Sequence, residues 1–592
     1  MGRLRTRGGH WAACAWLMLA GSAGAGAQVN QATPQRPSPK EPRTEAPAPQ
    51  VDAPGPQGQI VKRSYVSPID GAELEYAVWL PPDYEQRQDW PLIVFLHGSG
   101  EGADWLAPTT PHASIPVRTT QSDLPFVVVF PLLRGSWSIS ALAERDVLDT
   151  LADVQAHLPI DAERVHLVGL SMGGFAAWRI ACRYPDRFAS LTVFCGGGEP
   201  DLAGNVRHLP IRLYHGAADP VVPVEHSRTM AAALQRLRVP VEYVEVPAGN
   251  HLVWPGPLAE RGLYEWMSKR RRVCDPARVS FRTNSPRYSR SYWVAIEEFV
   301  DAREQAFVDA FVPEAEAMVL VHVENVARLR LSPPVRWFDS ARAPLFVVDN
   351  RRVKAESDGQ GWVLTLAETA ADRPRKREGL SGPIQDVLLD PFVVVVASDA
   401  DGKPLPKWQA AAEQAFAWRH RLTKQSIRFL PAAELTAELA AGAHLICFGD
   451  STNHAVLAEL TPKLPLYSDG QRVYVEGQAL PAELPAMVMV YPNLTAPGRC
   501  VVICSGKPEA VARLAAAALA PPMLHPPPQE DLLLLDARGR VLAPGGAWEA
   551  SNWKDAPLGT PLPPRGFLFT HTWELPPAVV EQLRALPNTD GP

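Results

Sequence analysis

Short apolar segments alternate with amphipathic ones over residues 59–275. Most of the candidate strands are continuous apolar runs, as expected for a parallel sheet covered on both faces; they lie at 91–96, 126–130, 165–168, 191–194, 211–214 and 241–246. Segments with helical periodicity separate several of them, at 141–157, 172–183, 225–237 and 258–271. An earlier segment, 73–80, alternates polar and apolar residues like a half-exposed antiparallel strand. This order of elements predicts an α/β domain.

The pattern changes after this domain. Short alternating strands predict a small β-rich, sandwich-like module over residues 276–375, with strands at 292–296, 317–323, 326–331, 346–348 and 362–366. The aromatic and basic segment 285–293 in this module fits sugar or polymer binding, but we favour packing at a domain junction.

Strand and helix signals alternate again over residues 376–592, which predicts a second α/β domain. The candidate strands lie at 392–396, 427–430, 445–448, 487–490, 501–504 and 532–535, and the helices at 408–419, 453–464 and 508–520. Ser505-Gly506-Lys507 is similar to part of a phosphate loop, but Pro508 occupies the position that needs Ser or Thr and the upstream glycine is missing. We therefore expect a structural, substrate-presenting or oligomerising role for this domain.

The N-terminal residues have the pattern of a secretory signal. Three arginines precede the short apolar run 11–20, and Ala25-Gly26-Ala27 forms a cleavage site before Gln28. The run is too short for a membrane anchor, so no membrane insertion is expected. We predict a signal peptide over 1–27, a Pro-rich disordered linker over 28–58, and a periplasmic or secreted protein.

Charge and cysteine content narrow the choice of partners. The 592 residues carry a formal net charge of -6 with a sequence pI near 6.2, which argues against binding nucleic acid. Cys500 and Cys504 would lie roughly 13 Å apart on one strand, so they cannot form a disulfide with each other. The seven cysteines form no CxxC pair, and we expect no metal site and no cofactor. The sequence assigns no disulfide and no oligomeric state.

One stretch carries the strongest chemical signal. Gly169-Leu170-Ser171-Met172-Gly173 follows the strand at 165–168 and precedes a helix. A serine between two glycines at a strand-to-helix turn is the nucleophile elbow of α/β-hydrolases, because larger flanking side chains would collide in so tight a turn. Ser171 is therefore the predicted nucleophile.

A serine hydroxyl needs an acid and a base, which this fold supplies in that order from later loops. Asp219 follows the strand at 211–214, and His251 follows the strand at 241–246. His251 would accept the proton of Ser171, and Asp219 would fix its tautomer and stabilise the imidazolium.

Further residues complete the predicted site. The backbone N–H of Met172 is one expected oxyanion donor, and that of Ser99 is the other, with Gly100 as the adjacent alternative. We expect His97 to fix this loop. Trp137 and Trp254 lie in loops at the same sheet edge, where they fit either substrate contact or loop packing.

Several segments resemble those of bacterial prolyl-oligopeptidase-like "predicted peptidases" and polyhydroxybutyrate-depolymerase/feruloyl-esterase-like hydrolases. They are 91–100, the elbow with Gly174, 184–189, 215–223 and the pair His251 and Trp254. The resemblance covers residues 59–274 and implies an α/β-hydrolase fold with Ser171, Asp219 and His251 as the triad. Asn250-His251-Leu252 departs from the pattern of relatives, which more often have Gly before the histidine and a small or polar residue after it.

These observations predict a secreted serine hydrolase that cleaves carboxylic esters, including polymer-attached ones, through an acyl-enzyme. A peptidase of the prolyl-oligopeptidase type is the alternative. However, such enzymes commonly carry a β-propeller before the catalytic domain, and only the signal, the linker and a strand-rich entry precede the oxyanion loop here. A catalytically inactive binding protein is a second alternative.

Overall fold

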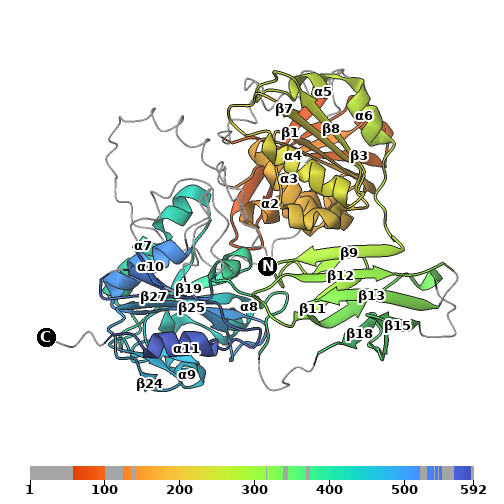
Figure 1. Ribbon diagram of the computed structural model, residues 1–592. Coiled ribbons are helices and arrows are strands. Elements are labelled where there is room, and N and C mark those ends of the chain that lie inside the picture. Colours follow the sequence, from red (N-terminus) through yellow and green to blue (C-terminus); the bar gives the residue numbers. More distant parts are fainter. Residues whose placement is uncertain are drawn as a thin grey trace, which may run out of the picture.

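The computed structural model describes most of the chain beyond the N-terminal segment (Figure 1). The described residues are 58–99, 124–134, 141–314, 317–337, 344–367, 374–423, 425–519, 530–538, 540–544, 546–549 and 566–587. The predicted signal peptide, the linker up to residue 57, Gly100 and Trp137 lie outside them.

The first domain is built on an eight-stranded sheet of order β1-β2-β4-β3-β5-β6-β7-β8. The strands are β1 (Gln59–Val66), β2 (Glu73–Leu80), β3 (Trp90–Leu96), β4 (Val127–Pro131), β5 (Ile160–Leu170), β6 (Ser190–Phe194), β7 (Ile211–Gly216) and β8 (Val241–Val246). β3 to β8 run parallel, whereas β2 is antiparallel to both β1 and β4. The carboxyl ends of the parallel strands therefore meet at one edge.

Helices cover both faces of this sheet. α2 (Ala141–His157), α3 (Met172–Arg183) and α4 (Glu225–Arg236) share one apolar cluster with the sheet. α5 (Pro255–Ala259) and α6 (Arg261–Ser268) contribute to the cluster on the other face. Short 3-10 helices lie at Tyr84–Gln86, Pro185–Arg187 and Pro200–Val206.

Two details of the sequence prediction for this domain are wrong, and β1 was not predicted. The helix expected at 258–271 is interrupted at Glu260, which has extended backbone angles and separates α5 from α6. β2 is not half-exposed, because Trp79 and Leu80 are buried in the clusters on opposite faces of the sheet.

The second domain is a sandwich of two five-stranded sheets with an apolar core between them. One sheet contains β16 (Arg351–Val353), β15 (Leu345–Val348), β13 (Met318–Glu324), β12 (Ala306–Phe311) and β9 (Arg278–Thr283). The other contains β10 (Arg290–Ser291), β11 (Val294–Phe299), β14 (Val326–Leu331), β18 (Trp362–Thr365) and β17 (Glu356–Ser357). A 3-10 turn lies at Val335–Trp337. The sequence pattern indicated the sandwich but did not reveal β9 or β12.

The third domain has a mixed eight-stranded sheet of order β20-β19-β21-β26-β25-β27-β28-β29. Its strands are β19 (Phe392–Val396), β20 (Phe429–Pro431), β21 (His444–Phe448), β25 (Ala486–Pro492), β26 (Cys500–Gly506), β27 (Leu532–Leu535), β28 (Arg540–Ala543) and β29 (Gly546–Glu549). A small sheet adds β22 (Leu466–Ser468), β23 (Val473–Val475) and β24 (Gln478–Ala479).

The helices of the third domain are α7 (Pro406–Thr423), α8 (Ala437–Gly442), α9 (Ala455–Leu460), α10 (Pro508–Leu519) and α11 (Pro577–Arg584). 3-10 segments lie at Ile384–Leu389, Ala432–Glu434 and Thr461–Lys463. The helix expected at 453–464 is shorter than predicted: the α-helix ends at Leu460, and Pro462 lies in the 3-10 turn that follows.

The first and third domains share an apolar core. Ile69 and Leu142 of the first domain belong to the same buried cluster as Leu388 and Phe392 of the third. Beside this seam, Asp70 Oδ2 accepts hydrogen bonds from Arg134 Nη1 at 2.6 Å and from the backbone N–H of Ser426 at 3.1 Å. The two domains are therefore joined by buried apolar and polar contacts.

The aromatic and basic segment of the sandwich also lies at a junction. The Tyr288 ring is buried under the guanidinium of Arg183 from α3, with 3.9 Å between Arg183 Cζ and the ring centroid. Arg287 pairs with Asp386 and Asp390 of the third domain. These contacts confirm the packing role that we favoured for this segment.

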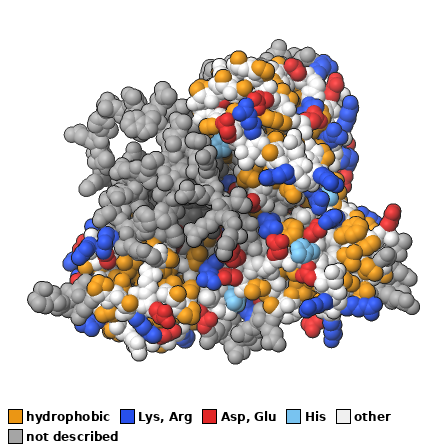
Figure 2. All heavy atoms as spheres, viewed as in Figure 1, with side chains coloured by type: hydrophobic (Ala, Val, Ile, Leu, Met, Phe, Trp, Pro, Cys, Tyr) orange, Lys and Arg blue, Asp and Glu red, His pale blue; other side chains and the backbone are white. Residues whose placement is uncertain are grey.

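Three further observations concern membrane-spanning helices, cysteines and surface charge among the described residues. No helix there combines the length and apolar character needed to cross a bilayer. The six cysteines in this part of the chain are free thiols, Cys500 and Cys504 included. On the face in Figure 2, the coloured basic and acidic side chains are intermingled, without the continuous basic stripe typical of nucleic-acid binding.

Candidate active site

Ser171 lies at the sharp turn between β5 and α3. Its backbone has φ 53° and ψ -119°, and its N–H donates to the carbonyl oxygen of Phe194 on β6 at 2.8 Å. Positive φ is unfavourable for a residue with a Cβ and persists only where the surroundings impose it. The turn thus holds the serine in a strained conformation at the carboxyl edge of the sheet.

The glycines beside Ser171 are required by contact distances. A Cβ on Gly169 would lie 2.1 Å from the carbonyl oxygen of Gly173, and a Cβ on Gly173 would lie 2.2 Å from that of Leu96. Real Cβ atoms do not approach backbone so closely, and backbone cannot move aside as a flexible side chain can. The steric reason predicted for these two glycines is confirmed.

The loops after β7 and β8 are joined to each other. The backbone N–H of Ala217 donates to Val246 O at 3.0 Å, and that of Ala218 donates to Gly249 O at 2.9 Å. Gly216 permits this approach, since a Cβ there would lie 2.2 Å from the carbonyl oxygen of Asn250. These contacts place Asp219 and His251 side by side.

The structure brings the three predicted triad residues together. His251 Nε2 lies 3.0 Å from Ser171 Oγ, and His251 Nδ1 lies 2.7 Å from Asp219 Oδ2. The ionised carboxylate accepts a hydrogen bond from Nδ1–H, which leaves Nε2 as the acceptor for the serine hydroxyl. The arrangement is thus able to move the proton of Ser171 to His251 during nucleophilic attack.

Asp219 is held by four donors. Its Oδ1 accepts from the backbone N–H groups of Val221 at 2.8 Å and Val222 at 2.9 Å, and its Oδ2 faces His251 and His215 Nε2, the latter at 3.3 Å. Burial alone would raise the pKa of Asp219, but the hydrogen bonds from His215, His251 and the backbone outweigh it and hold this pKa far below its usual value. The carboxylate therefore stays ionised.

On the oxyanion side, Met172 is the first residue of α3, and N–H groups in a first helical turn have no partner within the helix. The loop after β3 lies beside it, because a Cβ on Gly98 would be 3.7 Å from Ser171 Cβ. Ser99 follows directly and is exposed. Met172 and the loop that leads to Ser99 thus both lie beside Ser171.

His97 fixes this loop. Its Nδ1 lies 2.7 Å from the Gly98 carbonyl oxygen, and its Nε2 lies 3.2 Å from the backbone nitrogen of Leu133. The carbonyl only accepts, so Nδ1 carries the proton and Nε2 accepts. Burial lowers the pKa of His97 to about 4, which keeps the ring neutral.

Trp254 does not fit the predicted substrate contact. Its side chain is buried at 3% exposure, and its ring packs edge-on against the His251 imidazole with 5.5 Å between the centroids. This burial favours the alternative of loop packing for Trp254. The structure gives Trp254 a role in supporting His251. Trp137, the other predicted substrate residue, is outside the described residues.

Two groups behind the triad were not predicted as part of the site. Cys195, with φ 48° at the end of β6, donates from its thiol to the His251 carbonyl oxygen at 3.2 Å. His215 on β7 reaches Asp219. The Cys195–His251 contact depends on strand order, whereas His215 lies four residues before Asp219 and reaches it through the turn after β7.

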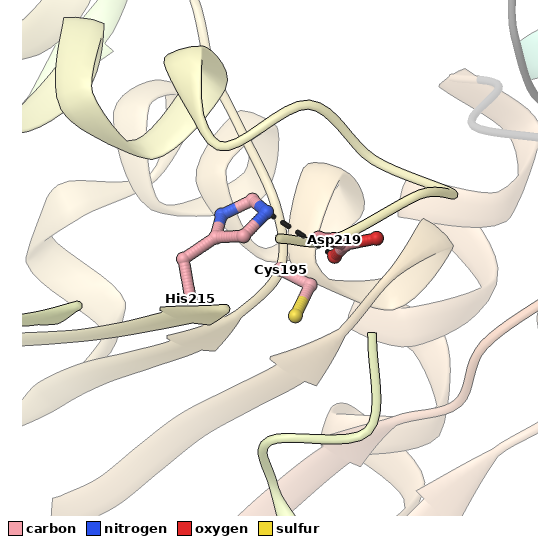
Figure 3. Close-up of side chains that lie close together, drawn as sticks. All are labelled: Cys195, His215 and Asp219. Atoms are coloured by element: carbon pink, nitrogen blue, oxygen red, sulfur yellow. Dashed lines mark ion pairs between the residues drawn. The ribbon is translucent and has the colours of Figure 1, made fainter. Parts of the chain in front are cut away.

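Cys195, His215 and Asp219 place a sulfur, a nitrogen and an oxygen close together, as a metal site would (Figure 3). Their donor atoms are already engaged, however. His215 Nε2 lies 2.9 Å from the Val222 carbonyl oxygen and must carry a proton, which removes its lone pair. Burial raises the pKa of the Cys195 thiol, so a thiolate is disfavoured. The cluster does not fit a metal ion and instead forms a hydrogen-bonded support for Asp219.

Comparison with known proteins points to esterases. Residues 141–260, which include all three triad positions, match the model of the phospholipase/carboxylesterase family. A probable feruloyl esterase C of Aspergillus terreus is 26% identical over 161 residues, covering 26% of this chain and 59% of that protein. Feruloyl esterase D of Neurospora crassa is 25% identical over 171 residues, covering 27% of this chain and 59% of that protein.

Among solved structures, a thermostable esterase is similar at a TM-score of 0.31 with 26% identity, covering 36% of this chain and 63% of that one. A ferulic acid esterase from Anaeromyces mucronatus is similar at a TM-score of 0.30 with 17% identity, covering 36% of this chain and 90% of that one. The chain spans about three fifths of the length of the two feruloyl esterases it matches in sequence. The family match and the sheet architecture identify the first domain as an α/β-hydrolase domain similar to those of esterases.

Proposed function

We propose that the protein is a serine hydrolase that cleaves carboxylic esters through an acyl-enzyme on Ser171. The observation that carries this proposal is the hydrogen-bonded series from Ser171 Oγ through His251 to Asp219, with distances of 3.0 and 2.7 Å. The matches to feruloyl esterases and to the carboxylesterase family favour an ester over a peptide as substrate.

In this mechanism, His251 Nε2 accepts the hydroxyl proton as Ser171 Oγ attacks the ester carbonyl. The backbone N–H groups of Met172 and Ser99 are the proposed donors to the oxyanion of the tetrahedral intermediate. His251 then protonates the departing alcohol, and water releases the acid from Ser171 by the same steps in reverse order. No cofactor takes part in this sequence.

The N-terminal sequence supports export as part of the proposal. Together with the esterase matches, it favours a substrate outside the cytoplasm, including esters attached to a polymer. Purification of the native protein from culture medium or periplasm, followed by N-terminal sequencing, tests this. A mature chain starting at Gln28 is expected, and a chain that retains residues 1–27 in the cytoplasm would contradict it.

The central test is covalent labelling. A fluorophosphonate probe reacts with activated serines, and peptide mapping of the labelled full-length protein should locate the adduct on Ser171. Absence of label on Ser171, while a control hydrolase is labelled, would support an inactive binding protein. Turnover of nitrophenyl esters, feruloyl esters and a prolyl peptide then ranks the substrates. Faster cleavage of the peptide would reverse the order proposed here.

A further inference from the structure

The triad residue Asp219 lies between two histidines. His251 approaches its Oδ2 from the loop after β8. His215 approaches the same oxygen from the end of β7 (Figure 3). His215 is completely buried, so it cannot touch a substrate. Any effect of this residue on the reaction must therefore pass through Asp219.

The proton on the facing nitrogen of His215 is fixed by its surroundings. Nε2 lies 2.9 Å from the Val222 carbonyl oxygen, which only accepts hydrogen bonds, so Nε2 carries a proton in every arrangement. On the other side of the ring, Nδ1 lies 2.7 Å from Ser227 Oγ, which itself lies 3.0 Å from the Gly196 carbonyl oxygen. Ser227 therefore orients the ring so that Nε2, whose proton is nearest the Val222 carbonyl oxygen, also lies 3.3 Å from Asp219 Oδ2.

Resting on the function proposed above, we infer that His215 is a positioning residue for the triad. Its Nε2–H orients the Asp219 oxygen that accepts a hydrogen bond from His251, and it also lowers the basicity of that oxygen. A carboxylate oxygen that accepts from two imidazoles binds each proton less strongly than one that accepts from a single ring. His215 thereby favours neutral His251, the form that accepts the serine proton.

Few other titratable groups face this network. Cys195 is protonated behind it and donates to the His251 carbonyl oxygen. Glu245 lies opposite His215 in the β7–β8 register but forms an ion pair with Arg228 at 2.6 Å. The hydrogen bond from Arg228 holds the pKa of Glu245 at about 2, so this carboxylate does not titrate between pH 5 and 9.

The proposal is tested by the pH profile of kcat/KM for His215→Phe, which keeps a ring but removes the donor. With one donor fewer, Asp219 stabilises the His251 imidazolium more strongly. The acidic limb should move to higher pH by about 0.5 to 1 unit, which corresponds to a three- to tenfold change in proton affinity. The loss of kcat/KM at pH 7 should largely disappear above pH 8.5, and KM should stay unchanged.

Two variants control this measurement. His215→Gln offers an amide N–H toward Asp219 and should return the limb toward its original position. His166→Phe removes another fully buried histidine, which pairs with Ser190 Oγ at 2.8 Å on the neighbouring strands, and should affect stability without moving the limb. A limb that is unmoved or displaced to lower pH in folded His215→Phe, or equal shifts in His215→Gln and His215→Phe, would overturn the inference.

A second measurement needs no folded variant at position 215. In the full-length protein labelled with ¹⁵N-histidine, the Nε2 of His215 should appear protonated throughout pH 5–9, and Ser227→Ala should perturb its resonance. An unprotonated Nε2 would overturn the inference even if ester hydrolysis is normal. Conversely, failure of the fluorophosphonate to label Ser171 would contradict the proposed function while this signal remains.

Discussion

The two α/β domains each contain a serine near a strand–turn–helix junction, and only Ser171 is hydrogen-bonded to a histidine in the described structure. Ser171 follows β5 and itself takes the positive φ of the turn, which lifts its hydroxyl toward His251. Ser505 lies within β26, and the positive φ falls on Gly506 before α10 begins. Ser505 stays 1% exposed, and its hydroxyl has no hydrogen-bond partner among the described residues.

The comparison shows what a nucleophile requires beyond sequence order. A strand, a serine, a glycine and a helix occur in both places. The difference is which residue bears the backbone strain, and whether neighbouring loops bring an imidazole over the hydroxyl.

Replacing the two serines should separate the sites most clearly. Ser171→Ala removes the nucleophile and should lower kcat for ester hydrolysis by at least about 10⁴-fold. Ser505→Ala should leave kcat within about twofold of the original protein, because this hydroxyl is buried and has no hydrogen-bond partner among the described residues. Initial rates with a nitrophenyl ester measure both. Equal losses in the two variants would invalidate the comparison.

Replacing the aspartates that follow strands in the two domains should likewise affect kcat only in the first domain. Asp219→Asn cannot hold the required tautomer of His251 and should lower kcat by about 10³- to 10⁴-fold. Asp450 follows β21 and accepts from the backbone N–H of Thr452 at 2.8 Å and from Asn453 Nδ2 at 2.7 Å. Asp450→Asn should cost only about 1 kcal/mol of stability and leave kcat intact. Rates and urea unfolding of both variants test this, and a large rate loss in Asp450→Asn would count against it.

Glycine-to-alanine substitutions should lower the stability of the protein at the turn around Ser171 but not at an unconstrained glycine. Gly173→Ala places a Cβ against the Leu96 carbonyl oxygen and should destabilise the first domain by about 3 kcal/mol or more. A Cβ on Gly442, at the end of α8, meets nothing within 4 Å, so Gly442→Ala should be neutral or stabilise by up to about 1 kcal/mol. Thermal unfolding measures the pair, and a tolerant position 173 would refute the packing argument.

A smaller effect, the loss of stability on acidification, should arise from one buried histidine in each of the two domains. Burial lowers the pKa of His97 and of His454 to about 4. Between their unfolded value near 6.5 and about 4, only the unfolded chain binds these protons. Stability is therefore full above pH 6.5 and is lost on acidification, with a limiting slope of about 1.4 kcal/mol per pH unit for each histidine.

Unfolding at pH 7 and pH 5 tests this linkage. His454→Leu, at 2% exposure in the original protein, should reduce the pH dependence without changing ester hydrolysis. An unchanged slope in that variant would argue against a neutral His454 in the folded protein.

The sequence predicted those parts of the site that depend on local pattern. Ser171, Asp219 and His251 each follow a recognisable strand, and the order of their loops in this fold determines that they meet. The need for glycine at positions 169 and 173 could be predicted from the sequence, because the tight turn leaves no room for side chains beside Ser171. The eight-stranded order itself placed these loops at one edge.

Other features depend on side-chain contacts that left no pattern in the chain. His215 differs from an ordinary core histidine through its contacts with Asp219 Oδ2, the Val222 carbonyl oxygen and Ser227 Oγ. Trp254 looked like a loop aromatic, yet the packing against His251 buries it. β1 was missed because an edge strand has no continuous apolar run, and its side chains alternate between partial burial and exposure.

The apolar seam between the first and third domains has a practical consequence for solubility. Ile69 and Leu142 are buried in the core cluster of the third domain. A hydrolase domain cut away after residue 275 would present these side chains to water, beside an Asp70 that has lost its contact to Ser426. Such a fragment is expected to self-associate even with an intact triad. The third domain therefore covers apolar side chains that the first domain on its own would expose.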